Sequence, residues 1–328
     1  MTQDNRQARP IILDCDPGHD DAVAIILALG SPAVELLAVT TVGGNQTLEK
    51  VTRNARAVLT VCGREDVPVY AGSPRPLVCQ VSTAGSIHGE TGLDGVDLPA
   101  AGAPLGRRRA AQFIADAVMS APAGTITLVA TGPLTNIALA ARLEPGIVER
   151  VREVVIMGGG FHEANWTAAA EFNIWVDPEA ARIVFEEDWD VTMVGLDLTH
   201  QALATEDVEA RIGALGTELS RFFVGLMGFF RASHGRTLNL AAPPLHDPCA
   251  VAYVVDPSIV ATKKAPVAIE TRGQFTTGMT VVDLRANAAT DCRTKVAYEL
   301  DRERFWDLVE QAFRRLGDGA DTGLRAEP

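Results

Sequence analysis

Four carboxylates lie within eight residues near the start of this 328-residue chain, in the run Asp14-Cys15-Asp16-Pro17-Gly18-His19-Asp20-Asp21. Negative charges crowded between apolar segments are costly unless a positive charge lies among them. Carboxylate oxygens are hard ligands that suit Ca²⁺ or Mg²⁺ better than zinc. Helix capping, the alternative, accounts for one or two aspartates at a helix start but not for four. The run therefore predicts a divalent-cation site.

The flanking residues predict how this run is positioned. Residues 11–13 are typical of a short buried strand, and Pro17-Gly18 is a turn signal that ends it. The apolar stretch 20–29 predicts a buried helix, because it is long and free of breakers. Asp16 then lies at the carboxyl end of a strand, and the last two aspartates lie in the first helical turn. Open α/β sheets bind ligands in this crevice.

The same alternation of strands and helices continues along the chain. Further strands are predicted at 36–42, 68–70, 125–130, 153–157 and 191–196, with helices at 48–62, 109–119, 133–143 and 177–187. This order favours parallel pairing with right-handed crossovers. We therefore predict an α/β fold, in which a mostly parallel, Rossmann-like central sheet is flanked by helices. One domain over residues 1–328, with a core of about residues 10–316, is the economical interpretation.

The C-terminal part predicts helices first and then a small strand region. Helices are expected at 206–215, 218–234 and 249–255, strands at 259–269, 279–284 and 295–300, and an amphipathic helix at 302–316. The helix 218–234 has apolar residues all round, so we expect it to be buried or to lie at a subunit interface. The strands 259–269 and 279–284 are expected to pair as a hairpin or small edge sheet. The polar tails 1–9 and 317–328 are expected to be disordered.

The composition argues against several classes of partner. The formal net charge is −13, from 29 basic and 42 acidic residues, which disfavours binding to nucleic acid. The longest apolar run, residues 22–29, is far shorter than the ~20 residues of a membrane span. The five cysteines are odd in number and form no CxxC pair, and residues 1–9 lack the apolar segment of a signal peptide. We therefore expect a cytoplasmic enzyme.

Further polar residues follow the predicted strands or interrupt apolar segments. They are Asn45 after two glycines, His88 in the irregular segment 75–104, Asn165, Glu171 and Asn173 after three glycines, and the His246-Asp247 pair between prolines. A loop as long as 75–104 is typical of a lid, a binding loop or a disordered segment. Asp247 either caps a helix beside a bystander histidine or adds a fifth carboxylate to the first cluster. Asp197 and His200, after strand 191–196, are interpreted as supporting or structural residues.

Residues 14–22, from Asp14 to Ala22, resemble the signature of the nucleoside hydrolases, the inosine-uridine preferring N-ribohydrolase family. Other segments look like family segments, appear in family order and extend the resemblance to about residues 10–316. They are 42–45, 130–136, 157–159, 171–173, 177–181 and 246–248. Such an ordered set is more specific than a single DxDPGxDD motif.

The resemblance implies a calcium-dependent enzyme that hydrolyses the N-glycosidic bond of ribonucleosides to free base and ribose. One Ca²⁺ per subunit would be bound by Asp16, Asp21, the backbone carbonyl of Thr131 and Asp247. Asp16 would also be the general base, and His246 the acid for the leaving base. The positions that bind the ribose and the base correspond to Asp20, Asn45, His88, Asn165, Glu171 and Asn173.

The resemblance leaves the base preference open. Family members with a pyrimidine or mixed preference often carry a tyrosine on the helix before the His-Asp pair, whereas residues 231–236 contain none. Either His234 takes that place or the contacts to the leaving base differ. Members with a tryptophan activator form another branch. Trp166 and Trp175 lie near site segments, but the His246 pattern is that of the histidine-bearing branch.

A homodimer or homotetramer is expected.

Two other functions fit part of the sequence. A haloacid-dehalogenase-like phosphatase also opens with a strand and D-x-D at a metal, but Gly18 stands where that family has Thr or Val. It would also leave Asp20 and Asp21 without a role. A catalytically inactive or regulatory protein that binds nucleosides or Ca²⁺ would keep the ligands and lose the base or the acid, yet both residues are present.

Overall fold

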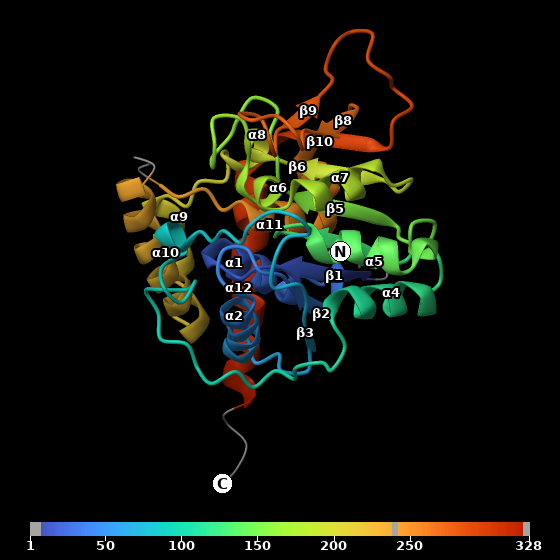
Figure 1. Ribbon diagram of the computed structural model, residues 1–328. Coiled ribbons are helices and arrows are strands. Elements are labelled where there is room, and N and C mark those ends of the chain that lie inside the picture. Colours follow the sequence, from blue (N-terminus) through green and yellow to red (C-terminus); the bar gives the residue numbers. More distant parts are fainter. Residues whose placement is uncertain (1–7, 238–241, 324–328) are drawn as a thin grey trace.

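An eight-stranded sheet runs through the computed structural model, which describes residues 8–237 and 242–323 (Figure 1). The strand order is β3-β2-β1-β4-β5-β6-β10-β7, and every neighbouring pair is parallel except β10 with β7. The strands are β1 Arg9–Cys15, β2 Val34–Thr41, β3 Val69–Ala71, β4 Thr127–Ala130, β5 Glu153–Met157, β6 Val191–Val194, β7 Val260–Lys264 and β10 Thr294–Leu300. The predicted mostly parallel α/β sheet is confirmed. In the doubly wound order 3-2-1-4-5-6, ligands bind where the order reverses, which is between β1 and β4.

Helices cover both faces of the sheet, because successive side chains of a strand point to opposite sides. Ile11 and Leu13 of β1 pack in one core with α1 His19–Gly30, α2 Leu48–Val61, α10 Glu218–Thr237, α11 Asp247–Val255 and α12 Arg302–Gly323. Ile12 packs in a second core with α4 Ala110–Ser120, α5 Thr135–Leu143 and α7 Pro178–Glu186. The connections carry α3 Gly85–His88, α6 Phe172–Val176, α8 Leu196–Thr199, α9 Glu206–Gly213 and two 3₁₀ turns, Pro145–Ile147 and Pro257–Ile259.

Helix α10 is held by contacts within the chain. Its buried side chains, Phe222, Phe223, Leu226, Met227 and Phe230, belong to the first core, and the helix contacts α1, α3, α9 and α12. Its other side, with Arg221 and Val224, is exposed. The prediction that this helix is buried is therefore confirmed for one side. The expected homodimer or homotetramer stays a prediction.

The C-terminal strand region differs from its predicted form. The segment 259–269 contains two strands in two sheets, because β7 pairs with β10 whereas β8 Val267–Ile269 pairs with β9 Thr280–Val282 in a separate antiparallel sheet. Pro266 lies between them, and a proline has no N–H to donate to a strand ladder. The prediction of one strand over 259–269 is therefore wrong, whereas the predicted hairpin or small edge sheet is confirmed for β8 and β9.

The helices and strands extend into both predicted tails. Helix α12 continues to Gly323, and the expected disorder from residue 317 stays a prediction. Arg9 already belongs to β1. The remainder of the two predicted tails, residues 1–7 and 324–328, lies outside the described residues. Within the segment 75–104, α3 forms one turn of helix that carries His88.

Asn136, in the first turn of α5, ties together the strand ends that carry the site. Its Nδ2 donates to Oδ1 of Asp14 at 2.8 Å and to the carbonyl of Thr41 at 3.0 Å. Its Oδ1 accepts from the backbone N–H of Ser73 at 2.9 Å. The carboxyl ends of β1 and β2 and the loop after β3 are therefore held in one place by a fully buried amide.

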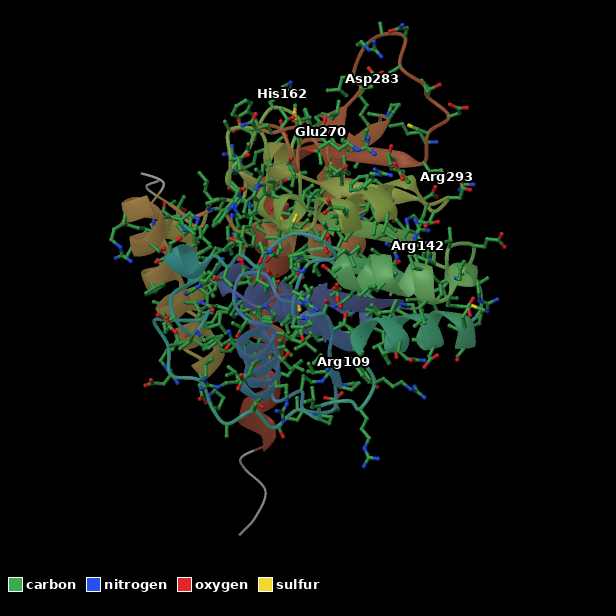
Figure 2. All side chains as sticks on the ribbon, viewed as in Figure 1. Arg109, Arg142, His162, Glu270, Asp283 and Arg293 are labelled. Atoms are coloured by element: carbon green, nitrogen blue, oxygen red, sulfur yellow. The ribbon has the colours of Figure 1, made fainter. Side chains whose placement is uncertain are left out.

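Charged side chains such as Arg109, Arg142 and Arg293 project from the periphery of the molecule (Figure 2). Among the described helices, none combines the length and the apolar character needed to cross a bilayer.

Candidate active site

Four buried aspartates meet at the carboxyl end of β1. Asp16 follows that strand, Asp20 and Asp21 lie in the first turn of α1, and Asp247 begins α11. Carboxylate oxygens of Asp20, Asp21 and Asp247 lie within 4.8 Å of one another. Of the two interpretations of Asp247, the structure supports the one that adds it to the first cluster.

Asp14 stands apart from this acidic cluster, although it belongs to the same sequence run. It is still within β1, where its Oδ1 accepts hydrogen bonds from the hydroxyl of Thr40 and the amide of Asn136. Burial raises the pKa of Asp14 to about 7. This aspartate therefore connects β1 to β2 and α5.

One hydroxyl and three N–H groups orient the cluster. The hydroxyl of Thr131 donates to Oδ1 of Asp21 at 2.9 Å, and the backbone N–H of Gly18 donates to Oδ2 at 3.0 Å, so this aspartate also caps α1. Asn45 donates from Nδ2 to Oδ2 of Asp21 at 3.2 Å and from its backbone N–H to Oδ2 of Asp16 at 2.6 Å. Oδ1 of Asp16 is buried and has no hydrogen-bond partner among the described residues.

The carboxylates of the cluster disfavour one another's ionisation. Burial first, and then the charge of Asp21, raise the pKa of Asp16 well above its usual range. The same two causes raise the pKa of Asp20 to about 7. Burial and the charge of Asp20 raise the pKa of Asp247 well above its usual range. Clustered buried oxygens, one of them unpaired, are a donor set that fits a hard divalent cation.

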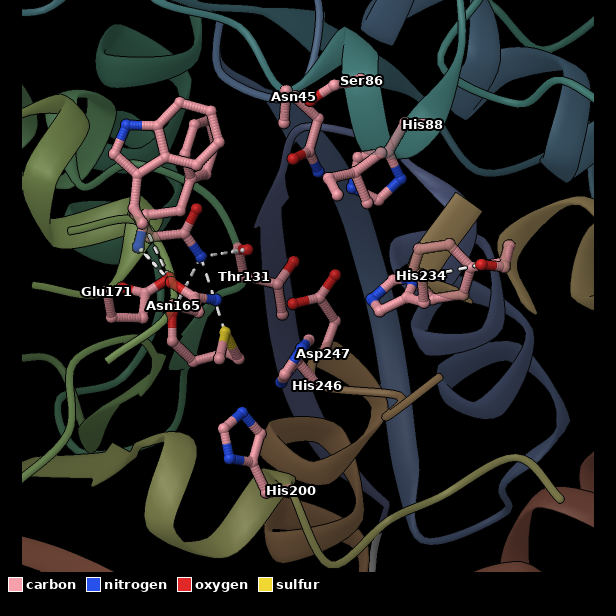
Figure 3. Close-up of a pocket in the computed structure, with 17 residues that line it drawn as sticks. Asn45, Ser86, His88, Thr131, Asn165, Glu171, His200, His234, His246 and Asp247 are labelled. Atoms are coloured by element: carbon pink, nitrogen blue, oxygen red, sulfur yellow. Dashed lines mark hydrogen bonds between the residues drawn. The ribbon is translucent and has the colours of Figure 1, made fainter. Parts of the chain in front are cut away.

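A cavity of about 280 Å³ opens onto Asp247 and Thr131 (Figure 3). Small-molecule sites begin at roughly 300 Å³, so this cavity is close to the smallest of them. Its walls come from the loops after β2, β4, β5 and β6 and from α3, α10 and the start of α11. This is the crevice that the strand order predicts. Figure 3 shows Asn165 and Glu171 on one side of the cavity, His88 and His234 on the other, and Asp247 and His246 between them.

The first side consists of Asn165, Glu171 and Asn173, which we call the amide wall. Nδ2 of Asn173 donates to the carbonyls of Thr131 at 2.9 Å and Met157 at 3.1 Å. The Thr131 carbonyl, predicted from the resemblance as a metal ligand, therefore already accepts one hydrogen bond. Oδ1 of Asn165 accepts from a backbone N–H of α6, and its Nδ2 has no partner among the described residues.

Glu171 uses both carboxylate oxygens to hold backbone. Its Oε2 accepts from the N–H groups of Gly159 at 2.9 Å and Ile174 at 3.1 Å, and its Oε1 accepts from Asn173 at 2.8 Å. Burial raises its pKa to about 7. The side chain thus joins the glycine loop after β5 to the start of α6, a function that the sequence analysis did not assign to it.

Four histidines also line the cavity, and we call them the imidazole wall: His88, His200, His234 and His246. Burial is the main cause that lowers the pKa of all four rings below the ordinary value of histidine. All four are therefore neutral near pH 7, and each ring has one N–H donor and one acceptor nitrogen.

Comparison with known proteins decides the family. The family model described as inosine-uridine preferring nucleoside hydrolase matches residues 11–307. The chain belongs to this family. The resemblance inferred from the sequence is confirmed, the phosphatase alternative is wrong, and the protein is an N-glycosyl hydrolase of class EC 3.2.2.

Relatives of this nucleoside hydrolase match over nearly their whole length. The inosine-uridine preferring nucleoside hydrolase of Crithidia fasciculata is 56% identical over 94% of this chain and 99% of that protein. The pyrimidine-specific ribonucleoside hydrolase RihA of Shewanella woodyi is 45% identical over 93% and 97%. The solved structure of the purine-preferring ribonucleoside hydrolase from Gardnerella vaginalis superposes with a TM-score of 0.88 at 34% identity, covering 94% of this chain and 99% of that one.

Two cavity residues of this nucleoside hydrolase were missed or placed elsewhere by sequence reasoning. His200 was interpreted as supporting or structural, but its ring lies on the cavity wall with its centroid 5.7 Å from that of His246. Phe230 was assigned only to an apolar helix, and its ring contacts both His88 and His234. Phe230 lies four residues before His234, and residues with this spacing share a helix face, so the sequence could have placed both rings together.

Proposed function

We propose that this nucleoside hydrolase releases the base from ribonucleosides in a calcium-dependent reaction at the cavity above the acidic cluster. The observation that carries the proposal is the buried group of Asp20, Asp21 and Asp247, which fits a hard cation and opens onto a nucleoside-sized cavity. Asp16, with its unpaired oxygen, and the carbonyl of Thr131 complete the proposed donor set. A bound Ca²⁺ would offset the charge of these carboxylates and polarise the oxygen atoms next to them.

The ribose is proposed to lie between the acidic cluster and the amide wall. The NH₂ group of Asn165 has no partner in the described part of the chain, and the carboxamides of Asn45 and Asn173 border the same cavity. Amide and carboxylate groups form hydrogen bonds with hydroxyls, and a site built to bind two hydroxyls rejects substrates that lack one. We therefore expect ribonucleosides to react better than deoxyribonucleosides.

Asp16 and His246 are proposed to move the protons. A water oxygen forms a bond to C1′ while the C1′–N bond breaks. The electron pair of the broken bond leaves with the base. Asp16 accepts the water proton through its unpaired Oδ1. Thr199 Oγ1 lies 2.8 Å from Nδ1 of His246. His246 acts as the acid in its protonated form, in which Thr199 accepts the N–H of Nδ1 and the N–H of Nε2 gives its proton to the departing base, leaving a neutral imidazole.

The substrates are proposed to include both inosine and uridine. The chain is 56% identical to a relative named for these two nucleosides and 45% identical to a pyrimidine-specific relative, which supports the mixed preference.

The location is proposed to be the cytoplasm. All five cysteines, each within the described residues, are free thiols, which supports this proposal.

The decisive experiment measures free ribose released from inosine, uridine, cytidine and adenosine, with and without a calcium chelator. We expect release that the chelator abolishes and added Ca²⁺ restores. Ribose release that withstands the chelator, in protein shown by elemental analysis to contain no metal, would contradict the calcium dependence. Binding of inosine without release from any nucleoside would favour the alternative of a binding protein without turnover.

A further inference from the structure

Side chains from distant segments hold the backbone of segment 158–165, which leads from the end of β5 to Asn165 of the amide wall. Four successive N–H groups, those of residues 159–162, each donate to a side chain. The acceptors are Glu171 for residue 159, Thr280 for residue 160 and Asp197 for residues 161 and 162. They come from the start of α6, from β9 and from α8. The position of the segment therefore depends on these three side chains.

Thr280 binds both polar backbone groups of Gly160. The N–H of Gly160 donates to Oγ1 of Thr280 at 2.9 Å, and the hydroxyl donates to the carbonyl of Gly160 at 2.5 Å. A Cβ at Gly159 would lie 2.6 Å from Cγ2 of Thr280, so the methyl group packs on the same backbone. Thr280 is 3% exposed, and buried polar groups that lose their partner are costly. This side chain thus fixes the segment near its beginning.

The small β8–β9 sheet holds Thr280 in place. It lies outside the main sheet, and β8 contacts α7 (Figure 1). Thr280 pairs with Ile269 of β8, whose side chain is buried in the second core. The small sheet therefore connects that core to the backbone of the amide wall.

A tight turn connects Gly160 to Asn165. A Cβ at Gly160 would lie 2.2 Å from the carbonyl oxygen of Glu163, so the chain folds back closely on itself here. Asn165 follows two residues later and lines the cavity, and its Oδ1 accepts the N–H of Phe172 at 3.1 Å. The position of its NH₂ group at the cavity therefore depends on how firmly the turn is held.

We propose that Thr280 is a positioning residue for the reaction, an inference that rests on the proposed binding of the ribose at the amide wall. Its hydroxyl keeps segment 158–165 in the conformation in which Asn165 meets the ribose. Without the hydroxyl, only a fraction of the molecules has this conformation before the substrate binds. KM then rises by the inverse of that fraction, whereas kcat is retained because the bound ribose selects the competent conformation.

The test compares kcat and KM for inosine and for nitrophenyl riboside, whose leaving group needs no proton, in the wild type and in Thr280→Val. Valine keeps the shape and removes the hydroxyl. We expect KM to rise about tenfold for both substrates, since they share the ribose, and kcat to change less than about twofold. Thr280→Ser restores the hydroxyl and should return KM toward the wild-type value. Thr294→Val is the matched control, because it removes a buried hydroxyl that donates to the carbonyl of Ala265, and it should leave KM unchanged.

A second background tests whether Thr280 acts through Asn165. Asn165→Ala should raise KM by itself, and adding Thr280→Val should raise it no further, because the positioned side chain is gone. A double variant in which Thr280→Val raises KM by its full factor would overturn the inference. If Thr280→Val does not fold, Thr280→Cys takes its place, since a thiol is only a weak hydrogen-bonding group.

Three further results would overturn the inference. The first is a wild-type KM in a Thr280→Val variant that is folded by thermal unfolding. The second is a fall in kcat with an unchanged KM, which would place the effect on the chemical step. The third is a rise in KM for inosine alone, which would place the effect on the base. A wild type that releases ribose from no nucleoside would instead overturn the proposed function, so the two failures are distinguishable.

Discussion

Replacing Glu171 by glutamine should destabilise the folded protein, because its two carboxylate oxygens accept three backbone N–H groups. An amide has the same shape but only one oxygen. If that oxygen keeps the N–H groups of Gly159 and Ile174, the NH₂ group faces the N–H of Asn173. Donor then meets donor in a site that is 3% exposed.

The magnitude follows from these contacts. One buried N–H without a partner costs about 1–3 kcal/mol. The two remaining bonds lose the assistance of a negative charge, at roughly 1 kcal/mol each, since hydrogen bonds to ionised groups are about twice as strong as neutral ones. The amide also relieves the cost of burying a charge, which is the cause that raises the pKa of Glu171, so part of this loss is offset. The free energy of unfolding should therefore fall by about 1–3 kcal/mol, which for a chain of this size corresponds to a decrease of roughly 2–6 °C in the unfolding temperature.

Thermal unfolding followed by circular dichroism measures this effect. The measurement is made at pH 8, above the pKa of about 7, so that the Glu171 carboxylate is ionised. Glu163→Gln is the matched control, because it makes the same change at an exposed carboxylate on the same loop and should shift the midpoint little. The reasoning fails if Glu171→Gln unfolds at the temperature of the control while losing ribose release. That combination would mean that the carboxylate acts on the substrate and not on the backbone.

The remaining two predictions concern proton transfer. Asp16→Asn should lower kcat for inosine by about 10²–10⁴-fold, the usual contribution of a general base, because an amide cannot take the proton; activity within a few-fold of the wild type would refute this role. His246→Phe should lower kcat for the hydrolysis of inosine by about 10²-fold or more and that of nitrophenyl riboside far less. An equal loss of kcat on both substrates would show that this histidine does not protonate the leaving base.

The pattern of the sequence was sufficient for the fold and for the first part of the site. Strands and helices alternate with clear periodicity, and each predicted parallel strand appears within a few residues of its expected place. Asp16, Asp20 and Asp21 follow a strand directly, so local order alone brings them to the sheet edge. Strand boundaries were predicted wrongly where pairing between distant segments sets them. Strand β7 ends at Lys264 because its ladder with β10 ends there, and after Pro266 the chain pairs in another sheet.

The sequence by itself determined the parallel α/β architecture, the acidic run at the end of β1 and the family. Only the tertiary structure decided which side chains share the site. It brings Asp247 to the acidic cluster, turns Asp14 toward Asn136, and directs both oxygens of Glu171 to backbone N–H groups. It also places His234 at the cavity, where a hydrogen bond within α10 holds its Nδ1. The physical reason is that residue type and spacing determine local conformation, whereas the partner of a buried polar atom is determined by packing between segments far apart in the chain.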